Sequence, residues 1–143
     1  MGILFDYFAA NSDDQAATAL ESTEGFLPVV ELKGIDPTFG MNSAESLLTG
    51  VDPDAVTENP RAEHLIAELG DAVYVTTLTD ELRDALAGAD ETDRLQVAEL
   101  WARMEELGDG CDPADLLPAV EELAGLARQA KAAGDRLYCR MCL

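Results

Sequence analysis

The chain has 143 residues, of which 48% are hydrophobic and 27% charged, so it can form one domain with its own core and is not disordered as a whole. Nine Lys and Arg against 29 Asp and Glu give a net charge of −20, which disfavours nucleic acid and anionic membranes as partners. No basic leader precedes the first apolar residues, and no apolar run approaches the roughly 18 residues of a membrane span. We therefore expect one cytoplasmic domain over residues 1–143.

Two strands and a short helix are expected at the start of the chain. Residues 2–8 are rich in β-branched and aromatic side chains, which predicts a strand. Residues 15–20 follow several N-cap residues, which predicts a helix. Residues 26–32 predict a second strand, and Pro28 places it at a sheet edge or marks its start, because proline lacks the N–H that a central strand needs.

The next helical signals lie between residues 42 and 60. Asn42 and Glu45 have the spacing of a capping box, which predicts a short helix that ends at Gly50. Asp52-Pro53 and Asn59-Pro60 each combine an N-cap residue with a proline suited to a first helical turn. A helix start is therefore expected at one or both positions.

Residues 63–69 are compatible with either a helix or a strand. If they form a strand, Gly70-Asp71 would turn the chain back into residues 72–78 as a hairpin. Residues 72–78 carry Val, Tyr, Val, Thr and Thr in succession and are the stronger strand prediction.

The C-terminal half is mainly helical. Three helices are expected, beginning at Thr79, Asp90 and Asp112, each with an acidic first turn. Gly134 would end the last helix in a left-handed cap, and residues 136–143 form an apolar terminal strand. The second helix is expected to end at Gly108 and to bury one stripe that includes the only tryptophan: Val97, Leu100, Trp101, Met104 and Leu107.

These elements predict an α+β fold. Strands at both ends of the chain must join one sheet for either to bury its apolar face, and the helices between them then cover that sheet. The sequence shows no internal repeat and no linker that would divide it.

Several short motifs resemble the YfbM-like family of bacterial proteins of unknown function. They are the Met1-Gly2 start, Leu47-Leu48-Thr49-Gly50, Leu78-Thr79-Asp80-Glu81-Leu82 and Ala132-Ala133-Gly134. The opening Met-Gly-Ile-Leu-Phe-Asp-Tyr-Phe is also similar to that of actinobacterial hypothetical proteins. The resemblance implies an α+β fold and implies no activity.

Cys139 and Cys142 form a C-x-x-C pair, a spacing found in zinc and thiol redox sites. Here the pair follows a helix, and residues three apart on a strand point to opposite faces, so we expect structural cysteines without zinc. Three cysteines, with Cys111, are an odd number that favours reduced thiols. Catalysis by Cys111 with His64 is disfavoured, because acidic neighbours oppose the thiolate.

Acidic residues also occur in pairs that could suggest a metal site: Asp52 with Asp54, Asp90 with Asp93, and Asp112 with Asp115. Most of them fall in the first turns of expected helices, where carboxylates accept backbone N–H groups. Residues 109–115 lack the spacing and the distal Glu of a calcium loop. We expect neither a metal nor a cofactor.

Four residues are the candidates for a binding site. Asp6 is a charge inside an apolar strand, although strand alternation favours a solvent-facing position for it. Lys33 and Asp36 lie at a strand exit, where sites are often built, and Tyr74 lies in the strong strand.

Binding is favoured over catalysis. The leading hypothesis is a non-catalytic acidic protein that binds a macromolecular partner, with a basic protein as the favoured kind, in the manner of toxin-neutralising immunity proteins and antitoxins. The alternative is a small-ligand-binding protein or an enzyme with a pocket around Asp6, Lys33, Asp36 and Tyr74. A broad acidic surface would support the first hypothesis, and a pocket of converging polar groups the second.

Overall fold

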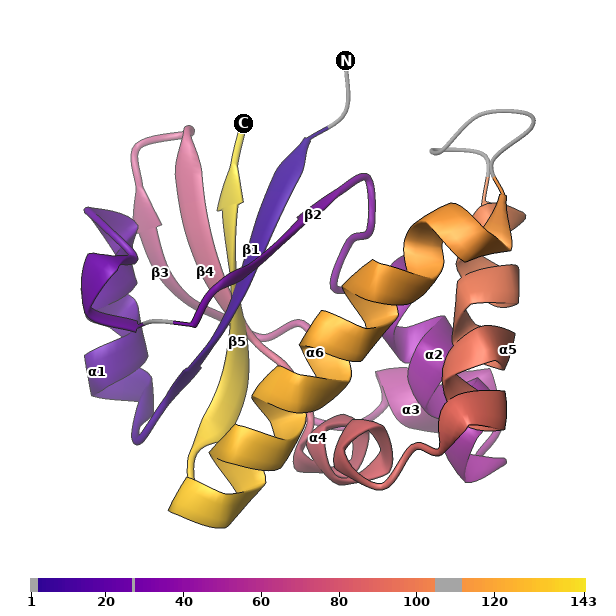
Figure 1. The fold of residues 1–143 in the computed structure, drawn as a ribbon. Coiled ribbons are helices and arrows are strands. Elements are labelled where there is room, and N and C mark those ends of the chain that lie inside the picture. The colour runs from indigo at the N-terminus through magenta and orange to yellow at the C-terminus, as the bar shows by residue number, and fades with distance from the viewer. Residues whose placement is uncertain (1–2, 27, 105–111) are drawn as a thin grey trace.

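The two ends of the chain pair with each other in the middle of one antiparallel sheet (Figure 1). The computed structural model describes residues 3–26, 28–104 and 112–143, and within them the sheet has five strands in the order β2-β1-β5-β4-β3. Seven residue pairs join β1 to β5, from Leu4 opposite Cys142 to Ala10 opposite Arg136. The strands are β1 (Leu4–Ala10), β2 (Val30–Lys33), β3 (Leu65–Leu69), β4 (Val73–Thr77) and β5 (Arg136–Cys142).

The helices cover the two faces of the sheet unequally. The longest helix, α6, contacts β1, β2 and β5, while α4 and α5 pack on α6 from the other side and α2 lies beside them (Figure 1). The helix α1 and the short 3-10 turns Thr18–Leu20 and Glu24–Phe26 lie on the opposite face. The α-helices are α1 (Asp13–Ala17), α2 (Phe39–Thr49), α3 (Pro53–Thr57), α4 (Asp80–Ala87), α5 (Glu91–Ala102) and α6 (Pro113–Ala133).

The predicted α+β class is confirmed, with both terminal strands in the sheet and three of these helices in the C-terminal half. Ser12, Thr79, Asp90 and Asp112 cap helices through their side chains, as residues with short polar side chains do at N-termini. Gly134 closes α6 with φ 74°, the left-handed conformation that favours glycine. These local signals were readable because each involves residues close in sequence.

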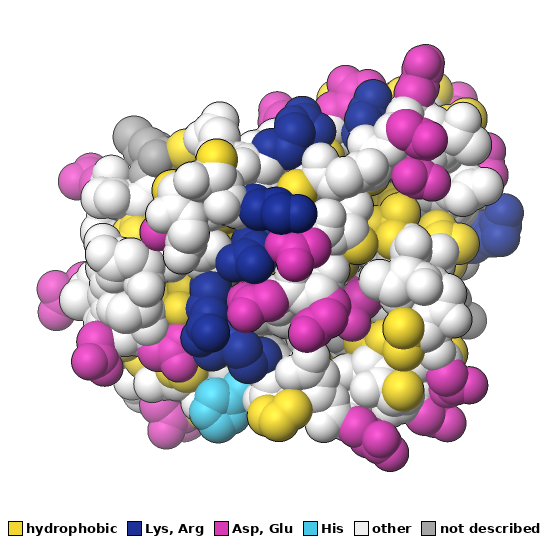
Figure 2. Space-filling model, turned by 90° about the horizontal axis from the view of Figure 1, so that it is seen from below, with side chains coloured by type: hydrophobic (Ala, Val, Ile, Leu, Met, Phe, Trp, Pro, Cys, Tyr) yellow, Lys and Arg dark blue, Asp and Glu magenta, His cyan; other side chains and the backbone are white. Residues whose placement is uncertain are grey.

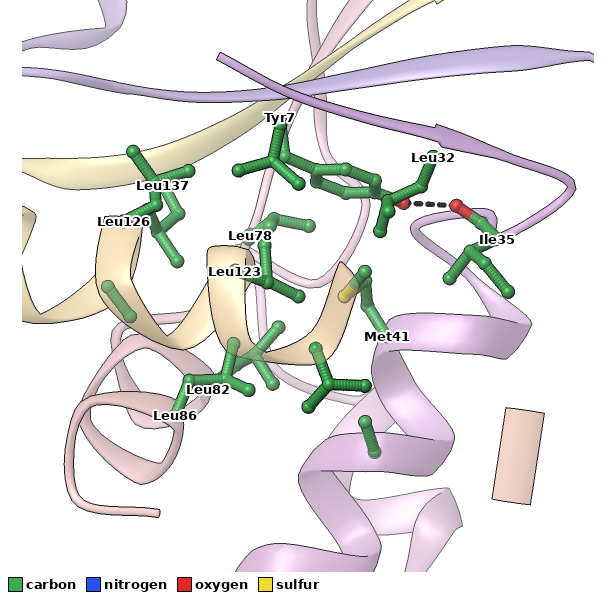
Figure 3. Packing of buried hydrophobic residues seen from close by; sticks show 14 of the residues in the cluster. Tyr7, Leu32, Ile35, Met41, Leu78, Leu82, Leu86, Leu123, Leu126 and Leu137 are labelled. Carbon is green, nitrogen blue, oxygen red and sulfur yellow. Dashed lines mark hydrogen bonds between the residues drawn. The ribbon is translucent and has the colours of Figure 1, made fainter. Parts of the chain in front are cut away.

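The larger core lies between the sheet and α6. Alternate residues of β1 and β5 point toward α6, among them Tyr7 and Leu137, and they meet Leu123 of α6 and Met41 of α2 (Figure 3). The Tyr7 hydroxyl donates a hydrogen bond to the carbonyl of Ile35, just before α2. A buried polar group thus has a partner within an otherwise apolar cluster.

The tryptophan of α5 belongs to this core, as expected. Trp101 has no solvent exposure, and its Nε1–H donates to the carbonyl of Gly40 at 3.0 Å. Val97 and Met104 of the same stripe are buried and Leu100 is half-buried. The expected continuation of the stripe to Leu107 and the helix end at Gly108 lie outside the described residues.

A smaller core lies on the other face of the sheet. Phe8, Val75 and Tyr138 project from three strands and pack under Ala16 of α1. The ring centroids of Phe8 and Phe26 are 4.8 Å apart, so the turn after α1 is held against the sheet as well. This cover does not extend over the whole face, because Leu4 and Leu69 near the end of the sheet are 41% and 54% exposed.

The predicted capping box at Asn42 and Glu45 is wrong. The helix α2 begins a turn earlier, at Phe39, where the backbone N–H of Gly40 donates to Oδ1 of Asp36 at 2.7 Å. Glu45 therefore lies inside the helix, where it is 4% exposed and accepts a hydrogen bond from the Thr79 hydroxyl. The predicted helix end at Gly50 is confirmed.

The strand boundaries also differ from the sequence prediction. The first strand spans Leu4–Ala10 instead of residues 2–8, and the second begins at Val30 because Glu24–Phe26 forms a 3-10 turn. The edge position indicated by Pro28 is confirmed. Of residues 63–69, which are compatible with a helix or a strand by sequence, Leu65–Leu69 form β3 in a hairpin with β4.

The helices of the described residues include none that is both long and apolar enough to cross a membrane.

Candidate functional site

The four candidate residues do not come together. Asp6 and Lys33 lie on the sheet face that points away from α6, since Asp6 pairs with Glu31 and Lys33 with Leu4 across β1 and β2. Tyr74 pairs with Met141, whose side chain packs against the core on the α6 face. Asp36 lies in the loop before α2, where its carboxylate accepts a hydrogen bond from the backbone N–H of Gly40 in the first turn of that helix.

Asp6 is buried, so the expectation of a solvent-facing side chain is wrong. Strand alternation does place it away from α6, but the segment after α1 covers that part of the sheet, and Asp6 is 6% exposed. Arg140, opposite Asp6 on β5, lies 3.6 Å away between Nη1 and Oδ2 and also donates to the Leu20 carbonyl at 3.3 Å. Burial, then the charge of Glu31, raises the pKa of Asp6, and Arg140 opposes the rise. The buried Asp6 and the half-buried Arg140 thus form an ion pair.

A second polar cluster joins α1 to the sheet. Nη2 and Nη1 of Arg61 lie 3.1 and 3.4 Å from the two carboxylate oxygens of Asp13. The Tyr138 hydroxyl donates to Asp13 Oδ1 at 2.7 Å, and the guanidinium of Arg61 stacks over the Tyr138 ring at 5.7 Å. Hydrogen bonds from Arg61 and Tyr138 lower the pKa of Asp13. Burial and the bond to Asp13 raise the pKa of Tyr138 to about 12, so this hydroxyl stays protonated.

The cysteines of the C-x-x-C pair are separated by the sheet. Cys139 is fully buried toward α6, and Cys142 is half-buried on the opposite side, since it pairs with Leu4. Burial raises the pKa of Cys139 well above its usual value, which opposes the reactive thiolate. Among residues 3–26, 28–104 and 112–143, no three His, Cys, Asp or Glu residues group as metal ligands would. Cys111 lies outside the described residues.

Several Lys and Arg side chains form a chain of ion pairs with the protein's own carboxylates. Asp84 of α4 lies 3.9 Å from Lys131 and 3.1 Å from Arg83, and Asp80 lies 3.8 Å from Arg83 and 3.4 Å from Arg136. The elements involved, α4 and the end of α6, lie at the bottom of Figure 1. Figure 2 views this side and shows Lys and Arg forming a band, with Asp and Glu beside it.

A groove runs along α6 beside the β2 edge of the sheet. One part, about 300 Å³, lies between α6, the end of β1 and the turn at Gly25, and a second, about 420 Å³, lies between α6 and the start of β2. Both parts are lined by Pro28, Leu126 and Gln129, so they are continuous, and we call them together the edge groove. None of the four candidate residues lines it.

Sequence reasoning missed this groove and the partners of Asp6 and Asp13. Arg140 had a recognisable signal, because it is a charge in the terminal strand as Asp6 is in the first. Gly125 also carried a recognisable signal, because a glycine inside a helix destabilises that helix and therefore suggests a packing or binding role. Arg61 lies in a loop and had none.

Comparisons with known proteins supply a fold neighbour only. No protein-family model matches the chain, and no curated protein matches it. A solved structure, that of YfbM from Escherichia coli, a protein of unknown function, is 12% identical with a TM-score of 0.46 and covers 98% of this chain and 99% of its own. It bears the name of the family that the sequence motifs resemble, and at this level of similarity it assigns no function or partner. The likeness to actinobacterial proteins stays a prediction.

Proposed function

We propose that the protein is a non-catalytic binding protein whose acidic surface docks a basic protein partner. The observation that carries this proposal is that most of the basic side chains are paired with carboxylates of the same chain. Five of the nine basic residues are held in ion pairs with carboxylates of the same chain: Arg61, Arg83, Lys131, Arg136 and Arg140.

These ion pairs leave an unbalanced acidic surface. The paired carboxylates are Asp6, Asp13, Asp80 and Asp84, a small part of the 29 acidic residues. Three of the paired cations lie around α4 and the end of α6, so the positive charge is concentrated on one side of the molecule. The chain as a whole carries 20 more carboxylates than basic groups, and this excess attracts a positively charged partner and orients it during encounter.

The buried reactive groups support binding over catalysis. The Cys139 thiol has its pKa raised by burial, the Glu45 carboxyl accepts from Thr79 in the interior, and Asp6 is paired with Arg140. Each is engaged in packing or in an internal polar contact, and none of them faces a groove described above. A basic toxin held inactive by an immunity protein or antitoxin is the kind of partner that such an acidic surface suits.

Affinity capture tests the proposal. The protein would be immobilised and exposed, at low salt, to an extract of the organism that encodes it, and retained proteins would be eluted by a salt gradient and identified. We expect a specific protein of basic isoelectric point that elutes as salt rises and is displaced by excess polyglutamate, because both compete for its positive charge. Retained proteins that are acidic, or that resist salt and polyglutamate, would overturn the proposal.

A further inference from the structure

We propose that the edge groove is the docking site for an extended segment of the partner, which adds to the sheet as a strand beside β2. The proposal rests on the function proposed above and names the surface that carries it. The partner segment alternates Lys or Arg with apolar residues. Three features support this geometry: the free backbone groups at the edge, the glycine in the α6 wall of the groove, and the charge of the groove.

The strand β2 offers unpaired backbone groups at the sheet edge. The N–H of Gly34 donates to the carbonyl of Ile3 at 3.1 Å, so the backbone N–H and C=O of Ile3 point toward β2. Because these groups alternate along a strand, the backbone groups of Phe5 and Tyr7 point toward β2 as well. Their partners Leu32 and Val30 then face β1, and the N–H and C=O of Glu31 between them point outward. In the described chain no strand lies beyond β2, so these groups are available to an added strand.

The end of β1 borders the groove beyond the start of β2. Its pairing with β2 stops at Tyr7, whereas its pairing with β5 continues to Ala10. The Leu137 carbonyl accepts a hydrogen bond from the backbone N–H of Leu78, which follows β4, so the backbone groups of Leu137 point away from β1. The backbone groups of its partner Ala9 therefore point away from β5, toward the side of β2. Ala9 lines the groove, and its outward backbone groups lie in the row that β2 occupies further along, so the groove reaches past the start of β2.

Asn11 shows how the chain satisfies an outward group at this edge. Two residues beyond Ala9, its backbone N–H would face the same side, and the side-chain oxygen of Gln15 accepts from it at 2.7 Å. Gln15 lines the groove beside Ala9. The free backbone edge of β1 therefore ends at Asn11.

Gly125 of α6 leaves the side of the groove without a side chain at this position, although packing does not require a glycine there. A Cβ built on Gly125 would meet only the end of the Arg128 side chain, at 3.8 Å. Since glycine weakens a helix interior, its presence here needs a reason, and Gly125 lines the groove next to Leu126 and opposite Val29. The missing side chain leaves room for a residue of the docked segment.

Charge selects the occupant. The residues that line the groove include Glu122 and Asp135 and no Lys or Arg. The Glu31 side chain lies on the sheet face away from α6, so alternate residues of an added strand would meet Glu31 on one face, and Pro28 and the space beside Gly125 on the other. This favours a segment of alternating basic and apolar residues. A second copy is disfavoured, because it would bring its own charge of −20 and a second Glu31.

A peptide selection tests the inference. Random octapeptides displayed on phage would be selected on the immobilised full chain, and enriched sequences would be synthesised and measured by fluorescence anisotropy. We expect enrichment of alternating Lys or Arg and apolar residues. Gly125→Leu, which fills the groove while the fold stays intact by circular dichroism, should weaken these peptides at least about tenfold. Ala132→Leu, an exposed position on the same helix outside the groove, should bind them as the original chain does.

A second measurement needs no protein variant. N-methylation of alternate backbone amides of an enriched peptide should abolish binding in one of the two alternations only, because only one set of amides faces β2. Basic peptides that bind Gly125→Leu as tightly as the original chain, or that tolerate both methylation patterns, would contradict the edge groove as the docking site. The proposed function would then still stand. A selection that enriches no basic peptide would overturn both.

Discussion

The hydroxyl of Tyr138, in the last strand, donates a hydrogen bond to Oδ1 of Asp13, at the start of the first helix, across 2.7 Å. The two residues are 125 positions apart in sequence, and Arg61 from a third segment binds the same carboxylate. This contact fixes α1 to the sheet and completes the cover over the smaller core. It therefore connects α1, near the start of the described chain, with β5 near its end.

Removal of this hydroxyl should weaken the fold measurably. Tyr138→Phe keeps the packing of the ring on Phe8 and deletes one hydrogen bond to a charged group, so we expect the free energy of unfolding to fall by about 1–2 kcal/mol. Urea denaturation measures the difference. Tyr74→Phe, at a half-buried position of β4, is the matched control and should change the value by less than about 0.5 kcal/mol. Equal losses in the two variants would contradict the role of the contact.

Trp101 should be essential for stability. It is fully buried between α5 and α2, and its indole N–H bonds to Gly40, so Trp101→Ala would leave a cavity and an unpaired carbonyl. We expect a loss of about 3–5 kcal/mol in the free energy of unfolding, and a smaller loss for Trp101→Phe, which keeps part of the volume. Thermal and urea denaturation check both values. A Trp101→Ala chain with an unchanged melting temperature would contradict its place in the core.

Glu45 gives the fold a specific pH dependence. Burial raises its pKa above the usual value, so the folded chain binds this proton more tightly than the unfolded chain does. Its contribution to stability is therefore present at low pH and is lost as pH rises through the raised native pKa. Glu45→Gln still accepts from Thr79 but does not titrate. The native chain should gain stability relative to this variant as pH falls from about 7 toward the usual pKa of Glu, a difference that paired urea denaturation series measure. Parallel pH profiles would contradict the prediction.

The features that could be predicted from the sequence are those that depend on residues close together in the chain. The caps at Thr79, Asp90 and Asp112 and the left-handed Gly134 depend on residues within a turn of each other, so they could be predicted. Glu45 could not, because its position depends on Asp36 starting α2 early and on Thr79, 34 residues away.

The candidate site shows the same limit. Alternation predicted a solvent-facing Asp6, and the side chain does lie on the sheet face away from α6, but it is buried there by Leu20 and Arg140, which only the folded chain brings near. The edge groove arises because β2 stops short while β1 continues, a difference in length between two strands that no local pattern encodes.

Salt should stabilise the isolated protein. With a net charge of −20 on 143 residues, carboxylates repel one another more than the ion pairs around Asp80 and Asp84 attract, so screening relieves a net repulsion. We expect the melting temperature to rise between low salt and about 0.15 M NaCl, and MgCl2 or CaCl2 at equal ionic strength to act alike. A melting temperature that falls with salt would contradict the excess repulsion, and a specific gain with one divalent ion would indicate a metal site.

The dependence of the association rate on salt tests the central claim most directly. Once a basic partner is captured, its association with the immobilised protein can be followed at about 0.02 M and about 0.15 M NaCl. A docking surface built on opposite charges should bind at least about tenfold faster at the lower salt, with a smaller effect on dissociation, because charge acts mainly on encounter. An association rate that is the same at both concentrations would contradict the claim and leave the acidic surface a role in solubility alone.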